Sequence, residues 1–174
     1  MNGDPSVSCP LSERGRGEAL ALGRALVDER IDLCVTSEFG RTHETADLAL
    51  ARGDVPRFVL PDLNDPNYGS FEGGLLDDYR AWARAHRSDE APPGGETRQQ
   101  IVARYARGFE TLLARPEETI LVVAHSLPVA YVLGGGDIAP VVPLVSHAEP
   151  HRLGAEELAE RVERMRAWLA DPSW

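Results

Sequence analysis

The side chains that could carry out chemistry begin with His125. This residue follows the apolar segment ILVVA (residues 120–124), which is typical of a strand buried on both faces of a parallel sheet. Ligands of open α/β sheets bind beyond the carboxyl ends of the strands, so the imidazole stands where a catalytic group is expected. A histidine at this position can also simply cap the strand by bonding to neighbouring backbone. His125 is therefore a candidate that other segments must support.

Arg41 is the second candidate. The segment FGRTHETADLALA (residues 39–51) predicts a loop entering a helix, directly after a short apolar strand over residues 31–36. A helix start offers unpaired backbone donors and a positive dipole end, and a guanidinium beside it makes a seat for phosphate or carboxylate. The alternative is that Arg41 only pairs with Glu38 or Glu44 on the surface.

Two acidic residues lie in the polar segment LPDLNDPNYGSFEGG (residues 60–74). A connection this long and this rich in proline and glycine is more often functional than accidental. Asp65 and Glu72 are its carboxylates of interest as proton donors, and a solvated loop acid is the alternative for each.

Composition excludes several classes of protein. A chain of 174 residues fits a single domain with a sizeable core. The net charge of −10 argues against nucleic acid and anionic membrane as partners, because both need clustered cations. A small anionic substrate would have to be held by a few arginines, since all 18 cations are arginine. No segment has the pattern of a membrane span or a signal peptide.

The two cysteines suggest a compartment. Cys9 and Cys34 form no CxxC pair and no spacing typical of a metal site, so we expect reduced thiols in a cytoplasmic protein without a metal or other cofactor. Cys34 is expected in the core of a strand.

Strands and helices are expected to alternate along the chain. Apolar stripes at helical spacing predict helices that position the candidates, and the first of these stripes comprises Leu20, Leu22, Leu26 and Val27. Such alternation predicts a three-layer α/β domain with a largely parallel sheet and helices on both faces. The expected helices cover residues 12–29, 39–51, 75–85, 96–114, 127–133 and 154–170, and the expected strands residues 31–36, 57–60, 120–124 and 141–145.

Five segments in order resemble the histidine phosphatase superfamily, the phosphoglycerate mutase-like proteins. They are PLSERGRGEA, similar to the family's first helix; TSEFGRTHETA, similar to its arginine motif; DLNDPNYGSFEG, similar to its acid loop; GGET, near the mouth of its site; and ILVVAHS, similar to its second-histidine motif. The resemblance covers nearly the whole chain and implies a phosphoglycerate mutase-like fold.

The resemblance also implies metal-independent hydrolysis of a small phosphomonoester through a phosphohistidine. Arg41 corresponds to a phosphate-binding arginine and His125 to the second histidine. Asp65 aligns with a glutamate of the family, whose side chain is one methylene longer than that of aspartate. By this resemblance Asp65 is assigned as the general acid. Glu72 is the second choice for that role.

One family motif is not found. The nucleophilic histidine belongs to an Arg-His-Gly motif on a first central strand, and none of the five histidines here has those neighbours. We expect residues 1–174 to be one N-terminally incomplete domain, inactive as this chain, with a homodimer as one outcome of an unpaired strand. The alternatives are a non-catalytic phosphate-binding pseudo-phosphatase and an α/β scaffold for a protein partner.

Overall fold

The computed structural model describes residues 1–51, 53–138 and 145–173. Helices and short parallel strands alternate along them, as the sequence predicts. The α-helices are α1 (Glu13–Ala25), α2 (Gly40–Ala49), α3 (Leu76–Ala85), α4 (Arg98–Leu113), α5 (Ser126–Leu133) and α6 (Ala155–Ala170). The strands are β1 (Leu33–Thr36), β2 (Arg57–Val59) and β3 (Ile120–Val123), and two short 3₁₀ helices, η1 (Pro61–Leu63) and η2 (Gly69–Phe71), follow β2.

The described strands form one parallel sheet in the order β2-β1-β3. Val35 of β1 is in register with Phe58 of β2 and with Val122 of β3. All four residues of β1 are buried, because it lies in the centre and is covered on both faces. Parallel pairing brings the carboxyl ends of the strands to one edge of the sheet, so the loops that follow them meet there.

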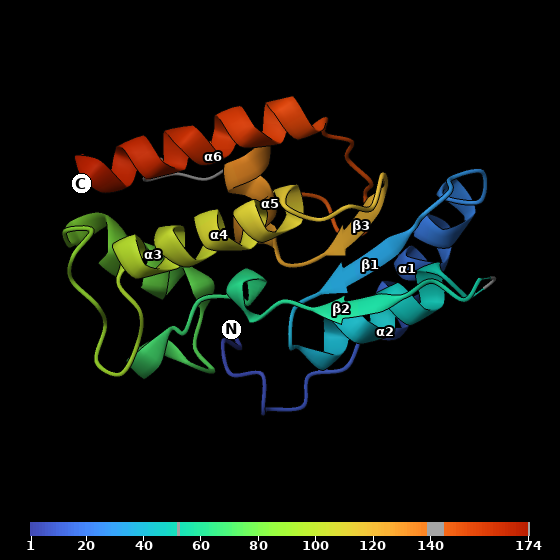
Figure 1. Cartoon of the computed structure of the whole chain (residues 1–174). Coiled ribbons are helices and arrows are strands. Elements are labelled where there is room, and N and C mark those ends of the chain that lie inside the picture. The colour runs from blue at the N-terminus through green and yellow to red at the C-terminus, as the bar shows by residue number, and fades with distance from the viewer. Residues whose placement is uncertain (52, 139–144, 174) are drawn as a thin grey trace.

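Helices cover both faces of this sheet (Figure 1). On one face, Val35 and Val122 pack in the larger core with Ile101 and Tyr105 of α4, and with α5 and α6. On the other face, Cys34 and residues of β3 pack against α2, which α1 covers in turn. The fold is therefore the three-layer α/β arrangement that the sequence predicts, with Cys34 in the core of a strand.

The amphipathic faces of α4 and α6 confirm the expected stripes. The four predicted inward residues of α4 are all buried: Ile101, Tyr105, Phe109 and Leu112. In α6, Val162 and Met165 are buried, and Leu158 and Leu169 pack against the same core. These two helices also contact each other, so their stripes are joined in one layer.

The expected first helix is shorter than predicted and its stripe is partly wrong. Helix α1 ends at Ala25, and the side chains of Leu20 and Val27 are 45% and 55% exposed. The face that packs on α2 is narrow and is carried by Ala19 and Leu22, three residues apart. Leu20 lies off that face and Val27 follows the end of the helix.

Strand β3 is covered on both faces, as predicted, because Ile120 and Val122 pack on one core and Leu121 and Val123 on the other, but its residues are not fully buried. All four of its residues are only half-buried. The physical reason is its place in the sheet: β1 pairs with one edge of β3, and no other described strand pairs with the second edge. Of the strand expected over residues 141–145, residues 141–144 lie outside the described part of the chain.

Candidate active site

The site forms where β1 and β3 end. Thr36 and Val123 are in register as the last residues of these strands, so the loops entering α2 and α5 leave the sheet side by side. His125 is the N-cap residue of α5, and its side chain is buried. Arg41 is the second residue of α2.

Arg41, His125 and Asp65 meet at one point. Nη2 of Arg41 lies 3.2 Å from Nδ1 of His125 and 3.0 Å from Oδ2 of Asp65. The same Oδ2 lies 3.7 Å from Nδ1 of His125. The side chains of Arg41 and Asp65 are only about one-fifth exposed, so the ion pair is largely shielded from water. Arg41 does not pair with Glu38 or Glu44 here; Glu38 contacts Asn64 and Glu44 contacts Arg16.

Phe39 holds the arginine and the histidine in place. Its ring is buried, and the guanidinium of Arg41 lies 4.1 Å from the ring centroid, within the range of a cation–π contact. The imidazole of His125 meets the same ring edge-on, with centroids 4.8 Å apart. One aromatic side chain therefore orients both polar groups, and the sequence argument did not identify it.

The other side of the imidazole is held by hydroxyl groups that sequence reasoning also missed. Nε2 of His125 lies 2.8 Å from Oγ of Ser37, a residue with no exposed surface. Oγ of Ser37 lies 3.0 Å from Oγ1 of Thr42. The available signal was weak: two small polar residues, Thr36 and Ser37, directly follow the apolar part of β1.

Asp65 comes from residues 60–74, which α4 fixes in place. Nη1 of Arg104 donates to the carbonyls of Asp62 and Asn64 at 3.0 and 2.8 Å. The hydroxyl of Tyr105 donates to the same Asn64 carbonyl at 3.1 Å. The residue before Asp65 is thus held by two side chains of one helix.

The GGET segment supports the same loop from the other side. The amide of Asn67 donates to the carboxylate of Glu96 at 2.9 Å, and the amide of Glu96 donates to the carbonyl of Asn67 at 3.0 Å. Gly69 has a φ of +55°, and a Cβ added there would lie 2.4 Å from the carbonyl oxygen of Pro93. Glycine is needed at this contact because no side chain fits between the two backbones.

Burial sets the protonation of the two titratable groups. It raises the pKa of Asp65 to about 6, although the neighbouring Arg41 acts in the opposite direction. Burial, with the positive charges of Arg41 and Arg104, lowers the pKa of His125 to about 3. At neutral pH the imidazole is neutral, and the carboxyl group of Asp65 can change its charge near physiological pH.

Glu72 has different partners. Its Oε1 accepts the amide hydrogen of Tyr68 at 2.8 Å, and its Oε2 accepts that of Gly3 at 2.9 Å. The carboxylate therefore ties residues 60–74 to the first residues of the chain. The carbonyl oxygen of Asn2 lies 3.2 Å from Nη2 of Arg41, so this first segment also reaches the site.

The other histidines have partners elsewhere. Nε2 of His43 lies 2.9 Å from the carbonyl oxygen of Ser37, and Nδ1 of His86 lies 2.7 Å from that of Trp82. His147 lies 3.9 Å from Glu18. The contacts of His86 and His147 are separate from the site, whereas His43 contacts the backbone of Ser37, the residue whose hydroxyl holds His125.

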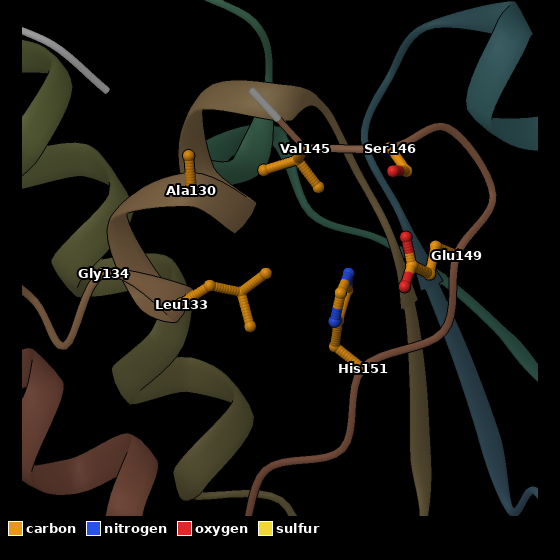
Figure 2. Close-up of a pocket in the computed structure, with 7 residues that line it drawn as sticks. All are labelled: Ala130, Leu133, Gly134, Val145, Ser146, Glu149 and His151. Atoms are coloured by element: carbon orange, nitrogen blue, oxygen red, sulfur yellow. The ribbon is translucent and has the colours of Figure 1, made fainter. Parts of the chain in front are cut away.

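His151 lines a cavity of about 240 Å³ at the other end of α5 (Figure 2). Figure 2 shows its ring and the carboxylate of Glu149 opposite Leu133, near the last turn of the helix. His125 precedes the first turn of the same helix, so this cavity is distinct from the site.

Within the described residues, no cluster of three or more histidine, cysteine, aspartate or glutamate side chains is arranged to hold a metal ion. In the same part of the chain, every helix is too short or too polar to traverse a lipid bilayer.

Comparisons with known proteins assign the chain to a family. It is 36% identical over 132 residues to a 2,3-bisphosphoglycerate-dependent phosphoglycerate mutase of Methylobacterium sp., which covers 66% of this chain and 62% of that protein. It is 32% identical over 125 residues to an adenosylcobalamin/alpha-ribazole phosphatase of Salmonella typhimurium, covering 67% of this chain and 61% of that protein. The chain therefore spans about three-fifths of the length of these two curated relatives.

A similar fold occurs in the crystal structure of the alpha-ribazole phosphatase from Shigella flexneri. The TM-score is 0.67 at 28% sequence identity, over 77% of this chain and 69% of that one. The sequence model of the histidine phosphatase superfamily (branch 1) matches residues 5–135. With three-quarters of its residues matched and the expected order of segments present, this chain belongs to the histidine phosphatase superfamily.

Proposed function

We propose that this site binds the phosphoryl group of a small phosphomonoester and belongs to a phosphohydrolase that works through a phosphohistidine. The observation that carries the proposal is the meeting of Arg41, His125 and Asp65 within 3.0 to 3.7 Å at the carboxyl edge of the sheet. An arginine and an imidazole hold phosphoryl oxygens, and a carboxylic acid protonates a leaving oxygen. Relatives of this chain include enzymes named as phosphatases and as a mutase.

Arg41 is assigned to the equatorial phosphoryl oxygens. Its guanidinium is already oriented by Phe39, so little conformational freedom is lost when an anion replaces Asp65 as its partner. A phosphoryl group beside Asp65 disfavours the carboxylate, because two negative charges would then share one guanidinium. Binding of the anion thus keeps Asp65 protonated, which is the state that a general acid requires.

Asp65, rather than Glu72, is assigned as that acid. The pKa of Asp65 is raised to about 6 by burial, close to the pH at which a proton donor is effective. Both oxygens of Glu72 accept backbone N–H groups, from Gly3 and Tyr68, so its carboxylate is engaged in holding this loop.

The nucleophile is assigned outside the described site. The family resemblance implies an Arg-His-Gly motif, which is absent from this sequence, and the contacts given above for the four histidines other than His125 do not include Arg41 or Asp65. We infer that the 174-residue chain binds phosphate but has no phosphatase turnover, because the motif that carries the family's nucleophile is missing. A non-catalytic phosphate-binding protein is the second candidate, favoured by the same missing motif.

The first test separates binding from turnover. Inorganic phosphate binding is measured by calorimetry on the chain and on Arg41→Met, with Arg14→Met as the control because Arg14 forms only an exposed pair with Glu18. We expect Arg41→Met alone to lose binding, since it lacks the central cation. Equal binding by both variants would refute the site assignment.

The second test addresses catalysis. An extended form carrying an upstream strand that ends in Arg-His-Gly is compared with the chain as given, using p-nitrophenyl phosphate. Turnover by the extended form alone supports the phosphatase site with the nucleophile supplied by the added motif, and binding without turnover in both forms supports the non-catalytic alternative. Turnover by the short chain would show that the nucleophile lies within these residues.

The third test assigns the acid in the active form. Asp65→Asn is expected to lose about 10²–10⁴-fold in turnover of an alkyl phosphate and much less with p-nitrophenyl phosphate, whose leaving group needs no protonation. Glu72→Gln serves as the matched variant and should lose far less on both substrates. The opposite ranking would move the role to Glu72.

Two wider proposals accompany the function. Cys9 and Cys34 are both free thiols, as expected for a cytoplasmic protein, and we place the protein there. A homodimer stays a proposal that sedimentation can test, with β3 as the strand whose second edge has no described partner.

A further inference from the structure

Three hydroxyl and imidazole groups form a short hydrogen-bonded chain behind the site. It runs from His125 Nε2 to Ser37 Oγ at 2.8 Å, and from there to Thr42 Oγ1 at 3.0 Å. Thr42 Oγ1 donates to the carbonyl of Phe39 at 2.8 Å, and its contact with the carbonyl of Ser37 is longer, at 3.3 Å. The amide of Phe39 donates to Ser37 Oγ at 3.3 Å. Ser37 and Thr42 are both buried, so their protons have only these partners available.

Two arrangements of hydrogen atoms satisfy this chain. In the first, His125 carries its ring proton on Nε2 and donates it to Ser37, and Ser37 donates to Thr42. Nδ1 is then an acceptor for Nη2 of Arg41 at 3.2 Å. In the second, Ser37 reverses its hydroxyl and donates to Nε2, and the ring proton sits on Nδ1. Thr42 donates to Phe39 in both arrangements, so no buried group loses its partner.

The two arrangements present opposite chemistry to the site. With the proton on Nε2, Nδ1 is an acceptor within 3.2 Å of Nη2 of Arg41, which also has Asp65 and the Asn2 carbonyl within reach. With the proton on Nδ1, the same atom is a donor for a phosphoryl oxygen. Because the ring is neutral in both, no net charge is buried, in agreement with the lowered pKa of His125. The exchange adds one proton at Nδ1 and removes one from Nε2, so no net proton is bound or released. Because Nε2 faces the buried Ser37, its proton leaves to water only while that hydrogen bond is transiently open.

We propose that Ser37, with Thr42 behind it, is a positioning residue that switches the tautomer of His125 from the Nε2–H form to the Nδ1–H form when a phosphoryl group binds. Only the change of tautomer on phosphoryl binding rests on the proposed function; the hydrogen-bonded chain itself does not. Ser37 suits this task because a hydroxyl donates and accepts at one atom, whereas a backbone carbonyl or amide would fix one tautomer.

The test is the tautomer of His125 in long-range ¹H–¹⁵N spectra of the histidine-labelled chain, in which protonated and unprotonated ring nitrogens have distinct shifts. His125→Gln assigns the signals among the five histidines. Without phosphate we expect Nε2–H, and with saturating inorganic phosphate Nδ1–H. A wild-type chain in the Nδ1–H form without phosphate, or in the Nε2–H form with phosphate bound, would overturn the proposal.

Two variants move the tautomer in ways that a merely structural role would not. Thr42→Val removes the acceptor for Ser37, which leaves His125 Nε2 as the partner of the Ser37 hydroxyl hydrogen. We therefore expect the Nδ1–H form even without phosphate. Ser37→Ala removes the Nε2 partner of both tautomers, so the ring loses the contact that orients it and phosphate binding should weaken about tenfold. Ser37→Thr, which keeps the hydroxyl, should restore it.

The outcomes separate this inference from the function on which it rests. If wild type binds no phosphate, the proposed function fails, while the phosphate-free tautomers of wild type and Thr42→Val still test the hydroxyl chain. An unchanged tautomer in folded Thr42→Val refutes the role of the chain even where phosphate binds. That variant also replaces Ser37→Ala if the latter does not fold.

Discussion

Replacing Asp65 with asparagine should change the free energy of unfolding in a way that depends on pH. The stability of the variant relative to wild type should be greater at neutral pH than at acidic pH. Burial raises the pKa of Asp65 from 3.8 to about 6 in the folded state. A raised carboxyl pKa contributes stability that is fully present below about pH 4 and is lost as pH rises through 6. The difference of about 2 between the folded and unfolded pKa values corresponds to about 3 kcal/mol of stability. This figure is an upper limit, because Asp65 is one-fifth exposed and solvent screens part of the effect.

Asparagine keeps the shape of the side chain but does not ionise, so Asp65→Asn avoids this loss. The free energy of unfolding of the variant minus that of wild type should rise by about 2–3 kcal/mol between pH 4 and pH 7. Urea unfolding of both proteins at half-unit pH steps measures it. The lowered pKa of His125, about 3, adds stability that is present above pH 6.5 and is lost on acidification. His125 titrates in both proteins, so its contribution cancels from the difference.

Asp89→Asn provides the control with the opposite sign. Hydrogen bonding to Arg87 lowers the pKa of this exposed carboxyl, so its contribution is present at neutral pH and lost on acidification. The variant-minus-wild-type difference should therefore fall, not rise, as pH increases. A flat or falling profile for Asp65→Asn would refute the reasoning that burial outweighs Arg41 at this carboxyl.

Three further substitutions probe the same region. Arg41→Met should raise the pKa of Asp65 above 6, because the guanidinium lowers it. The carboxyl ¹³C shift of Asp65 followed across a pH titration measures this pKa, and an unchanged value would show that the pairing is incidental. Gly69→Ala should lower the free energy of chemical unfolding by about 2 kcal/mol or more, since the added Cβ meets backbone at 2.4 Å. The control Gly73→Ala, also at positive φ but with open space around it, should lower it by about 1 kcal/mol. Equal losses would contradict the steric account. Tyr105→Phe should cost about 1 kcal/mol by the same assay, because the Asn64 carbonyl keeps its bond from Arg104; a loss several times larger would mean that the hydroxyl holds more than this loop.

Local sequence patterns determined the elements and the edge at which the site forms. Apolar residues at helical spacing identified α4 and α6, and the inward faces follow from the period of the helix alone. Arg41 and His125 could be placed near each other because each follows a strand, and parallel strands end at one edge. The order of five segments added the family resemblance, which the comparisons confirm.

Exposure depended on neighbours that no local pattern contains. Leu20 and Val27 are as apolar as the buried residues of α1, but only a narrow face of that helix meets α2. The residues of β3 fit a strand buried on both faces, yet they are half-buried because the described sheet pairs with one of its edges. Burial is a property of the assembled layers, and periodicity gives only the direction in which a side chain points.

The chemistry of the site was likewise decided by tertiary contacts. Ser37 and His125 are 88 residues apart in sequence, and no spacing rule links a hydroxyl after one strand to an imidazole after another. The raised pKa of Asp65 comes mainly from desolvation, which requires the loop to be held down by Arg104 and Tyr105. Residue types gave the acid, the cation and the imidazole, whereas their distances and protonation states exist only once distant segments exclude water from the same small volume.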